Sequence, residues 1–153
     1  MEASRRTSVI LMAEDDEDDC VLVETALAES HLDYDLRCVG DGEEMMDYLR
    51  RRGNYAAVDA PRPDMILLDL NMPAKDGRAV LKEIKDNLEL MDIPVVVLTG
   101  SSNEVDREYC YALGVNYYFT KNAWLDSLVE IIRDSGQYWF DRMTGKMDEW
   151  ASA

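Results

Sequence analysis

Uninterrupted apolar runs are the strongest pattern in the sequence. Ser8–Ala13, Met65–Leu68 and Val95–Leu98 carry apolar residues at almost every position, without alternation of polar and apolar side chains. That pattern is typical of central parallel strands that are covered on both faces. Two shorter runs, Leu36–Val39 and Asn116–Thr120, complete a set of five predicted strands.

Between the strands, apolar residues recur at helical spacing. The pattern predicts helices at about residues 18–30, 43–52, 78–88, 103–113 and from about 123 onward. The residues expected to face the core are Leu81, Ile84 and Leu88 in the third helix and Val105, Tyr109 and Ala112 in the fourth.

Strands that alternate with helices indicate an α/β fold, a doubly wound parallel sheet whose crossovers are right-handed. The sequence shows no internal repeat, no low-complexity tract and no second domain. We therefore expect one domain at residues 8–140, preceded by a flexible N-terminus at 1–7 and followed by a tail at 141–153.

Composition and charge exclude several classes of function. The 153 residues are 47% hydrophobic and 31% charged, which suits one domain with a core of its own. The net charge of −16 argues against nucleic-acid binding, because neutralising phosphates needs clustered Lys and Arg. No apolar run approaches the ~18 residues of a membrane span, and none resembles a secretory leader. We expect a cytoplasmic protein.

The cysteines and the single histidine offer little metal chemistry. Cys20, Cys38 and Cys110 are odd in number and lack metal-ligand spacing, so we expect reduced, partly buried thiols. His31 alone leaves no material for a His-based metal cluster.

Chemically active side chains follow several strands at the point where each strand ends. Glu14 and Asp15 follow the first strand, Asp69 the third, Thr99 the fourth and Lys121 the fifth. All these ends meet at one edge of a parallel sheet, where open α/β sheets bind their ligands. Close carboxylates repel unless a cation joins them, and oxygen ligands favour Mg²⁺.

Each of these residues also has a simpler interpretation. Asp69 alone could cap the turn through Pro73 and Gly77, and the acidic run from Glu14 could be a solvated helix N-terminus. It is their predicted convergence that favours a site. There, an ionised Asp69 could accept a phosphoryl group if the metal and Lys121 neutralised its oxygens.

These residues carry a specific family resemblance. Over nearly its whole length the chain resembles the receiver domains of two-component response regulators. The motifs that carry it are Glu14-Asp15-Asp16, Asp69-Leu-Asn-Met-Pro-Ala-Lys-Asp-Gly77, Leu98-Thr99-Gly-Ser and Tyr118-Phe-Thr-Lys121, in the family's order. The resemblance implies a flavodoxin-like sheet with strand order 2-1-3-4-5 and five helices.

The resemblance also implies a role for each site residue. Asp69 would accept phosphate from a sensor histidine kinase or a histidine phosphotransfer protein. Asp15 and Asp69 would ligate Mg²⁺ directly, with Mn²⁺ as a possible substitute, Glu14 would act through water, and Asn71 would add its backbone carbonyl. Lys121 would be the cation that binds the phosphoryl group, and Thr99 would be the switch hydroxyl. Tyr118 would be the switch aromatic that turns inward. The alternative for Tyr118 is an aromatic at the rim that covers the sheet edge.

One position departs from the family pattern. Members commonly have a cis proline directly after the lysine, whereas this chain has Asn122. A non-proline cis bond costs roughly 3 kcal/mol, so either a strained peptide persists or the loop after Lys121 follows another path.

The C-terminal sequence bears on output. Little sequence follows the last predicted helix, so we expect output through another protein or through self-association, as in stand-alone regulators partnered with phytochrome-like sensor kinases. In that group, the helix at 103–113, the strand at 116–120 and the last helix form a homodimer. We assign Trp139 and Phe140 to that surface; the alternative is that they fold back onto their own core.

Two other classes use similar residues. A haloacid-dehalogenase-like phosphatase needs a second acid two residues after its nucleophile, where this chain has Asn71. A degenerate receiver that only binds proteins would be expected to have lost carboxylates or the lysine, and all are present. The sequence therefore predicts a phosphoacceptor rather than an enzyme that turns over substrate.

Overall fold

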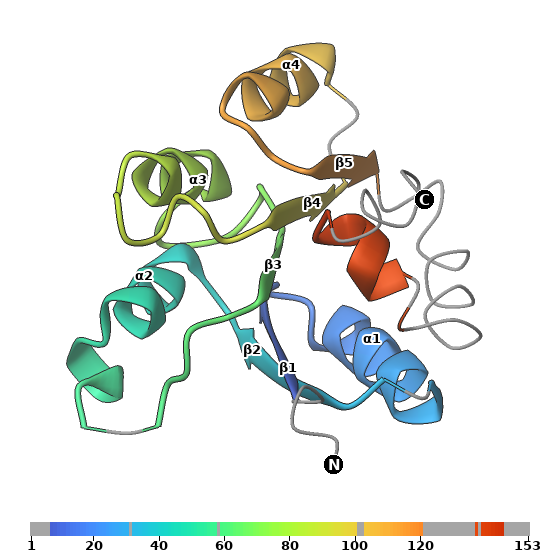
Figure 1. The fold of residues 1–153 in the computed structure, drawn as a ribbon. Coiled ribbons are helices and arrows are strands. Elements are labelled where there is room, and N and C mark those ends of the chain that lie inside the picture. The colour runs from blue at the N-terminus through green and yellow to red at the C-terminus, as the bar shows by residue number, and fades with distance from the viewer. Residues whose placement is uncertain are drawn as a thin grey trace.

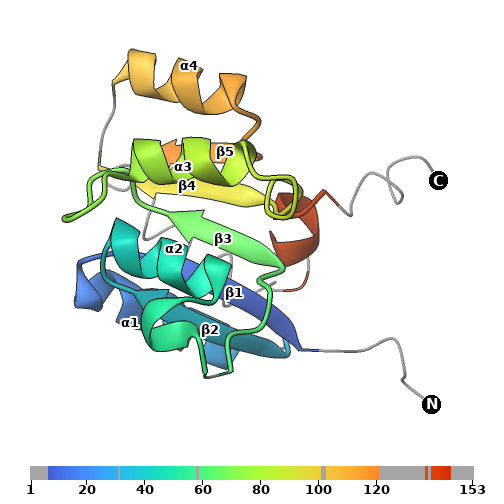
Figure 2. The ribbon, with the colours of Figure 1, turned by 90° about the vertical axis from the view of Figure 1, so that its left-hand side faces the viewer.

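A five-stranded parallel sheet forms the centre of the protein, with helices on both of its faces (Figures 1 and 2). The computed structural model describes residues 7–30, 32–57, 59–100, 103–120, 137 and 139–145. The strands are β1 (Ser8–Ala13), β2 (Tyr34–Val39), β3 (Met65–Leu68), β4 (Val95–Thr99) and β5 (Tyr117–Thr120). Their order, β2-β1-β3-β4-β5, confirms the predicted flavodoxin-like arrangement.

The helices begin close to the predicted positions. They are α1 (Glu17–Glu29), α2 (Gly42–Arg50), a single 3₁₀ turn η1 (Gly53–Tyr55), α3 (Gly77–Lys85) and α4 (Glu104–Ala112). Residues 137 and 139–143 are also helical. The beginning of the predicted fifth helix, at about 123, lies outside the described residues, as does His31.

Each of the helices α1 to α4 begins at an acidic or amide side chain that caps it. The side chain accepts a hydrogen bond from a backbone N–H of the first turn at Asp16, Asp41, Asp76 and Asn103. A cap of this kind contributes about 1 kcal/mol and fixes where the loop ends and the helix starts. This matters at Asp16 and Asp76, because both loops carry candidate site residues.

Two cores sandwich the sheet. One lies under α2, α3 and α4 and includes Met45, Leu81 and Cys110. The other lies on the opposite face and joins Val23 and Leu27 of α1 to residues of the C-terminal helical segment. Because β3 and β4 are buried on both faces, they read as unbroken apolar runs.

Four inward-facing assignments made from helical spacing, one in the third predicted helix and three in the fourth, are wrong. Leu88 is 86% exposed, because α3 ends at Lys85 and Leu88 lies in the following turn. On α4, Val105 is 70% exposed and the helix turns Asp106 and Cys110 inward instead. The apolar residues of α4 are therefore not its buried face, and Tyr109 and Ala112 are exposed with Val105.

The C-terminal segment belongs to the fold. Trp139 is 3% exposed and Phe140 1% exposed, and both pack in the core beside α1. Their assignment to a dimer surface is therefore wrong, since their side chains are already covered within one chain. Met143 is buried in the same core, so the packed part extends past the predicted boundary at 140.

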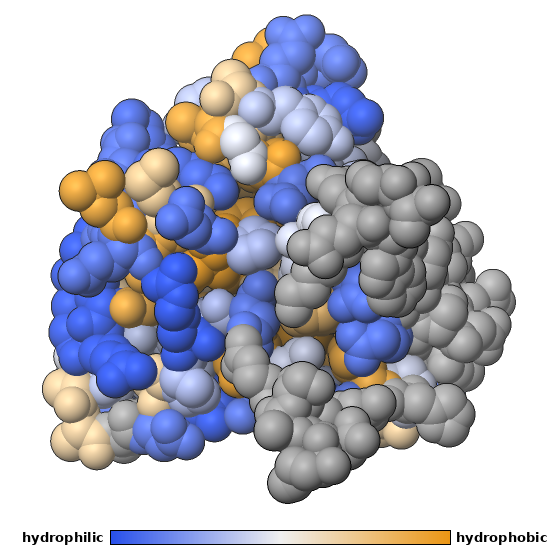
Figure 3. All heavy atoms as spheres, in the orientation of Figure 1, coloured by the Kyte–Doolittle hydropathy of each residue, from blue (hydrophilic) through white to orange (hydrophobic). Residues whose placement is uncertain are grey.

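One face of the described surface is mostly hydrophilic, in keeping with the acidic composition, and the three cysteines form no disulfide. On the face in Figure 3, hydrophilic residues cover most of the described surface. Within the described part of the chain, no helix combines the length and apolar character of a membrane span. All three cysteines are free: Cys110 is buried, Cys20 is half-buried and Cys38 is exposed.

Candidate functional site

The sheet register places Glu14 next to Asp69. Asp69 continues β3 by one residue, and its backbone N–H donates to the Ala13 carbonyl at 3.1 Å. Glu14 continues β1 in the same way, with its N–H donating to the Val39 carbonyl at 2.9 Å. Both side chains are buried; Asp69 is only 4% exposed.

Three carboxylates gather at this point. Single oxygens of Glu14, Asp15 and Asp69 all lie within 4.8 Å of one another. Asp15 is exposed, whereas the other two are buried. Three negative charges at this spacing are stabilised by a divalent cation, and an all-oxygen donor set is the type that Mg²⁺ and Mn²⁺ prefer. The cluster predicted from the sequence thus has the donors for a hard metal ion.

The Glu14 side chain also shapes the loop. Its Oε2 accepts a hydrogen bond from the Asp16 N–H at 3.1 Å, and Asp16 in turn caps α1 through the Asp18 N–H at 2.9 Å. These two contacts turn the chain sharply after β1. They hold Asp15 at the exposed side of the cluster, where a ligand arriving from solvent would meet it.

Asn71 and Thr99 lie beside Asp69. The Asn71 N–H donates to Asp69 Oδ1 at 3.1 Å, and the Asn71 side-chain amide donates to Thr99 Oγ1 at 3.4 Å. Thr99 is fully buried at the end of β4. A line of polar groups therefore connects the Asp69 carboxylate to the fourth strand, as the strand-end argument predicted.

Close packing of two glycines holds the loop that follows Asp69. A Cβ at Gly77 would lie 2.4 Å from the Asp69 carbonyl oxygen, and one at Gly42 would lie 2.0 Å from the Lys75 carbonyl oxygen. No side chain fits at such separations. The loop can fold tightly against β3 and α2 only because both positions are glycine.

Tyr118 lies inward. Its side chain belongs to the core under α2, α3 and α4, and its N–H donates to the Tyr111 hydroxyl at 3.1 Å. The Arg107 guanidinium lies over both rings, 5.5 Å from the Tyr111 centroid and 5.7 Å from that of Tyr118. The sequence suggested Tyr118 as a mobile aromatic, but it did not suggest this cation–π contact from α4.

Sequence reasoning also missed an ion pair between two helices. Arg78, in the first turn of α3, binds the buried carboxylate of Asp106 on α4. The signal was present, because Asp106 and Cys110 are four residues apart and share one helix face. Lys121 and Asn122 lie outside the described residues, so the position of the predicted phosphoryl-binding cation and the path of the chain after it stay predictions.

Comparison with known proteins agrees with this site. The family model for the response regulator receiver domain matches residues 10–133, a span that includes all the candidate site residues. The chain belongs to the response regulator receiver family. It is therefore a phosphoryl acceptor of two-component signalling, and a receiver domain of this kind interacts with a sensor kinase.

Relatives within the family are close in sequence and fold. The response regulator Rcp1 of Synechocystis sp. is 44% identical over 141 residues, which are 92% of this chain and 95% of Rcp1. The phosphorylated cyanobacterial phytochrome response regulator RcpA matches with 48% identity and a TM-score of 0.76, over 84% of this chain and 90% of RcpA. The Mn²⁺-bound form of Rcp1 matches with 47% identity and a TM-score of 0.76, over 82% and 89%.

Proposed function

We propose that Asp69 is the phosphoacceptor of this receiver and that its donor is a sensor histidine kinase or a histidine phosphotransfer protein. The observation that carries the proposal is the carboxylate cluster: Asp69 is buried at a strand end, with oxygens of Glu14 and Asp15 within 4.8 Å. Similarity to RcpA, which was solved in a phosphorylated form, supports the same chemistry.

The cluster is proposed to bind Mg²⁺, with Mn²⁺ as a substitute. Asp15 and Asp69 would be direct ligands, Glu14 would act through water, and the Asn71 backbone carbonyl would complete the protein ligands. The Mn²⁺-bound structure of Rcp1 supports this assignment. When bound, the cation supplies positive charge next to the carboxylates and the incoming phosphoryl oxygens.

The chain's own groups perform the transfer. One Asp69 oxygen bonds to phosphorus while the N–P bond of the donor phosphohistidine breaks, and the electron pair of that bond stays on the imidazole nitrogen. The Asn71 N–H, 3.1 Å from Asp69 Oδ1, holds that oxygen and leaves the other to attack. Lys121 is proposed to bind a phosphoryl oxygen. Because all these groups belong to the receiver, a small acyl phosphate should serve as donor, and slow hydrolysis should follow without a phosphatase.

The switch is proposed to run through Thr99 and Tyr118. Thr99 already accepts a hydrogen bond from the Asn71 amide. A phosphoryl oxygen would accept a hydrogen bond from the Thr99 hydroxyl and draw the end of β4 toward Asp69. Tyr118, already buried, would be retained inward by that movement.

The output is proposed to be a homodimer through α4, β5 and the last helix. On α4, the side chains of Val105, Tyr109 and Tyr111 are exposed. Burying them would remove apolar area from water on association. Because the proposed donors are intracellular kinase domains, we also propose a cytoplasmic location.

Intact mass spectrometry tests the acceptor. The protein is incubated with Mg²⁺ and acetyl phosphate, and we expect one phosphoryl adduct that disappears in Asp69→Ala. The matched control is Asp86→Ala, which removes an exposed carboxylate paired with Lys82 and should leave the adduct intact. An adduct that persists in Asp69→Ala contradicts the assignment. Turnover of many phosphate esters would instead favour a phosphatase, and no adduct with any donor a protein-binding module.

A further inference from the structure

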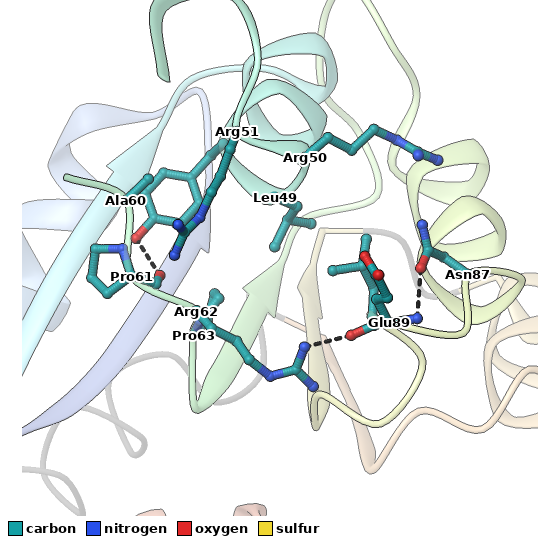
Figure 4. A pocket seen from close by; sticks show the side chains of 11 residues that line it. Leu49, Arg50, Arg51, Ala60, Pro61, Arg62, Pro63, Asn87 and Glu89 are labelled. Atoms are coloured by element: carbon teal, nitrogen blue, oxygen red, sulfur yellow. Dashed lines mark hydrogen bonds between the residues drawn. The ribbon is translucent and has the colours of Figure 1, made fainter. Parts of the chain in front are cut away.

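A cavity of about 320 Å³ lies at the edge of the sheet opposite the carboxylate cluster. Its walls come from the end of α2, from residues 60–63 before β3 and from residues 87–90 before β4 (Figure 4). These segments precede their strands, whereas the carboxylates follow theirs. The cavity is therefore separate from the phosphorylation site.

The floor of the cavity is apolar and well ordered by hydrogen bonds. Tyr48, Ala60, Pro63 and Leu90 line it and are buried. The Tyr48 hydroxyl donates to the Pro61 carbonyl at 2.8 Å, which ties the segment before β3 to α2. The floor of the cavity is thus built from packed side chains.

The wall between the two loops is also bonded. The Arg62 guanidinium donates to the Glu89 carbonyl, and the Glu89 N–H donates to Asn87 Oδ1 at 2.7 Å. Figure 4 shows Arg62 reaching across to Glu89 while Arg50 extends toward Asn87. At about 320 Å³, the cavity is at the lower end of the range for small-ligand sites.

The rim is basic in a strongly acidic protein. Arg50, Arg51 and Arg62 line the cavity against a single carboxylate, Glu89, although the chain carries a net charge of −16. Arg50 is neutralised by Glu83 at 2.7 Å. Among the described residues, no carboxylate lies within ion-pair distance of Arg51 or Arg62. Two guanidinium groups therefore leave a positive charge at the mouth.

Arg51 has an unusual backbone for its residue type. It ends α2 in the left-handed region, at φ 56° and ψ 51°, where glycine is the easiest residue. The strained position fixes an arginine at the rim, which favours a binding role.

We propose that this cavity binds a small organic anion, a phosphate or carboxylate head group on a compact apolar body. The guanidinium groups of Arg51 and Arg62 would pair with the head group, for which a planar fork of N–H donors is suited. The apolar body would cover the floor at Pro63 and Leu90. The site lies outside the phosphoacceptor chemistry and does not depend on it.

Chemical-shift titration of the ¹⁵N-labelled full chain tests the proposal. Asp69→Ala without divalent cations excludes binding at the carboxylate cluster. The probes are phenyl phosphate, benzoate, inorganic phosphate and neutral benzyl alcohol. We expect an aryl anion to shift the amides of residues 48–51, 62 and 87–90, and benzyl alcohol to leave them unchanged. Binding of phenyl phosphate alone assigns a phosphate ester, and binding of benzoate alone a carboxylate.

Variants then identify the arginines. Arg51→Gln and Arg62→Gln should each weaken binding about tenfold. Arg52→Gln is the matched control, because it removes the same charge one residue away from a side chain that pairs with Asp47 outside the cavity. The proposal is overturned if no aryl anion binds, if Arg52→Gln weakens binding as much as Arg51→Gln, or if inorganic phosphate binds as tightly as phenyl phosphate.

Discussion

The Arg78 guanidinium donates two parallel hydrogen bonds to the Asp106 carboxylate, from Nε to Oδ1 at 2.7 Å and from Nη2 to Oδ2 at 2.5 Å. Arg78 Nη1 also binds Asp76, the cap of the same helix, at 2.9 Å. The contact joins the start of α3, which follows the Asp69 loop, to the buried face of α4. It also explains why a charged residue of α4 faces inward.

This ion pair should stabilise the fold measurably. The hydrogen bonds to Asp106 raise the pKa of Arg78 and keep it charged. Asp106→Ala removes the bidentate partner of Arg78, which keeps its contact with Asp76 and some exposure to solvent, so the free energy of unfolding should fall by about 1 to 2 kcal/mol. A double-mutant cycle with Arg78→Met by urea unfolding measures the coupling. The exposed pair of Lys82 and Asp86 should give under about 0.5 kcal/mol in the same cycle; equal values would contradict the buried-pair account.

Gly77→Ala should disturb the Asp69 loop. The new Cβ meets backbone atoms of Asp69 and Leu70, which cannot move like a flexible side chain. We expect a loss of about 1 to 3 kcal/mol in stability together with slower phosphoryl transfer from acetyl phosphate. Gly100→Ala is the control for stability, because a Cβ there meets nothing within 4 Å. Equal melting temperatures for the two variants would show that the contact at Gly77 relaxes freely.

Trp139→Ala should be among the most damaging substitutions outside the sheet. Its ring is buried in the core beside α1, so truncation should cost about 3 to 5 kcal/mol. Leu88→Ala should change stability by less than about 0.5 kcal/mol, because Leu88 is exposed. Urea unfolding of both variants measures the difference. Similar unfolding midpoints would contradict the burial of Trp139 and favour the dimer surface to which the sequence assigned it.

The thiols should react with iodoacetamide in a fixed order. The hydrogen bond from Cys20 lowers the pKa of Cys38, whereas burial raises the pKa of Cys110 to about 11. The thiolate is the nucleophile, so at pH 8 Cys38 holds more reactive form and should be alkylated first. The rate at Cys110 should still rise with pH up to about 11. Peptide mapping at timed intervals measures both; Cys110 reacting as fast as Cys38 contradicts this account.

Metal binding should depend on the individual carboxylates of the cluster. Asp15→Asn should weaken Mn²⁺ binding by at least about tenfold, because it removes a charged ligand. Asp16→Asn is a matched control: it removes the neighbouring charge, but asparagine caps a helix as well as aspartate does. Calorimetric titration compares the two. An equal loss in both variants would mean that general charge, and not ligation by Asp15, determines affinity.

Much of the fold could be predicted because it follows from local patterns. The unbroken apolar runs at Met65–Leu68 and Val95–Leu98 admit little besides buried parallel strands. Once the sheet is parallel, Glu14, Asp15 and Asp69 must meet at one edge, and they do. The position of Lys121 relative to them depends on residues outside the described part of the chain.

The buried face of a helix could not always be predicted from apolar spacing. Apolar spacing on α4 pointed to Val105 and Tyr109, but the helix buries Asp106 because Arg78 neutralises it. Spacing assumes that charge faces water, and a partner more than twenty residues away in sequence overrides that assumption. The basic cavity is likewise assembled from three separate segments, so no local pattern indicated it.

The sequence by itself determined the strands, their parallel direction and the gathering of carboxylates at their ends, because burial on both faces and strand polarity follow from consecutive residues; the strand order was implied by the family resemblance. Only the tertiary structure decided the buried face of α4, the packing of Trp139 and Phe140 against the α1 side and the arginine-lined cavity. Those features depend on contacts between segments that are far apart in the sequence, and such contacts exist only in the folded chain.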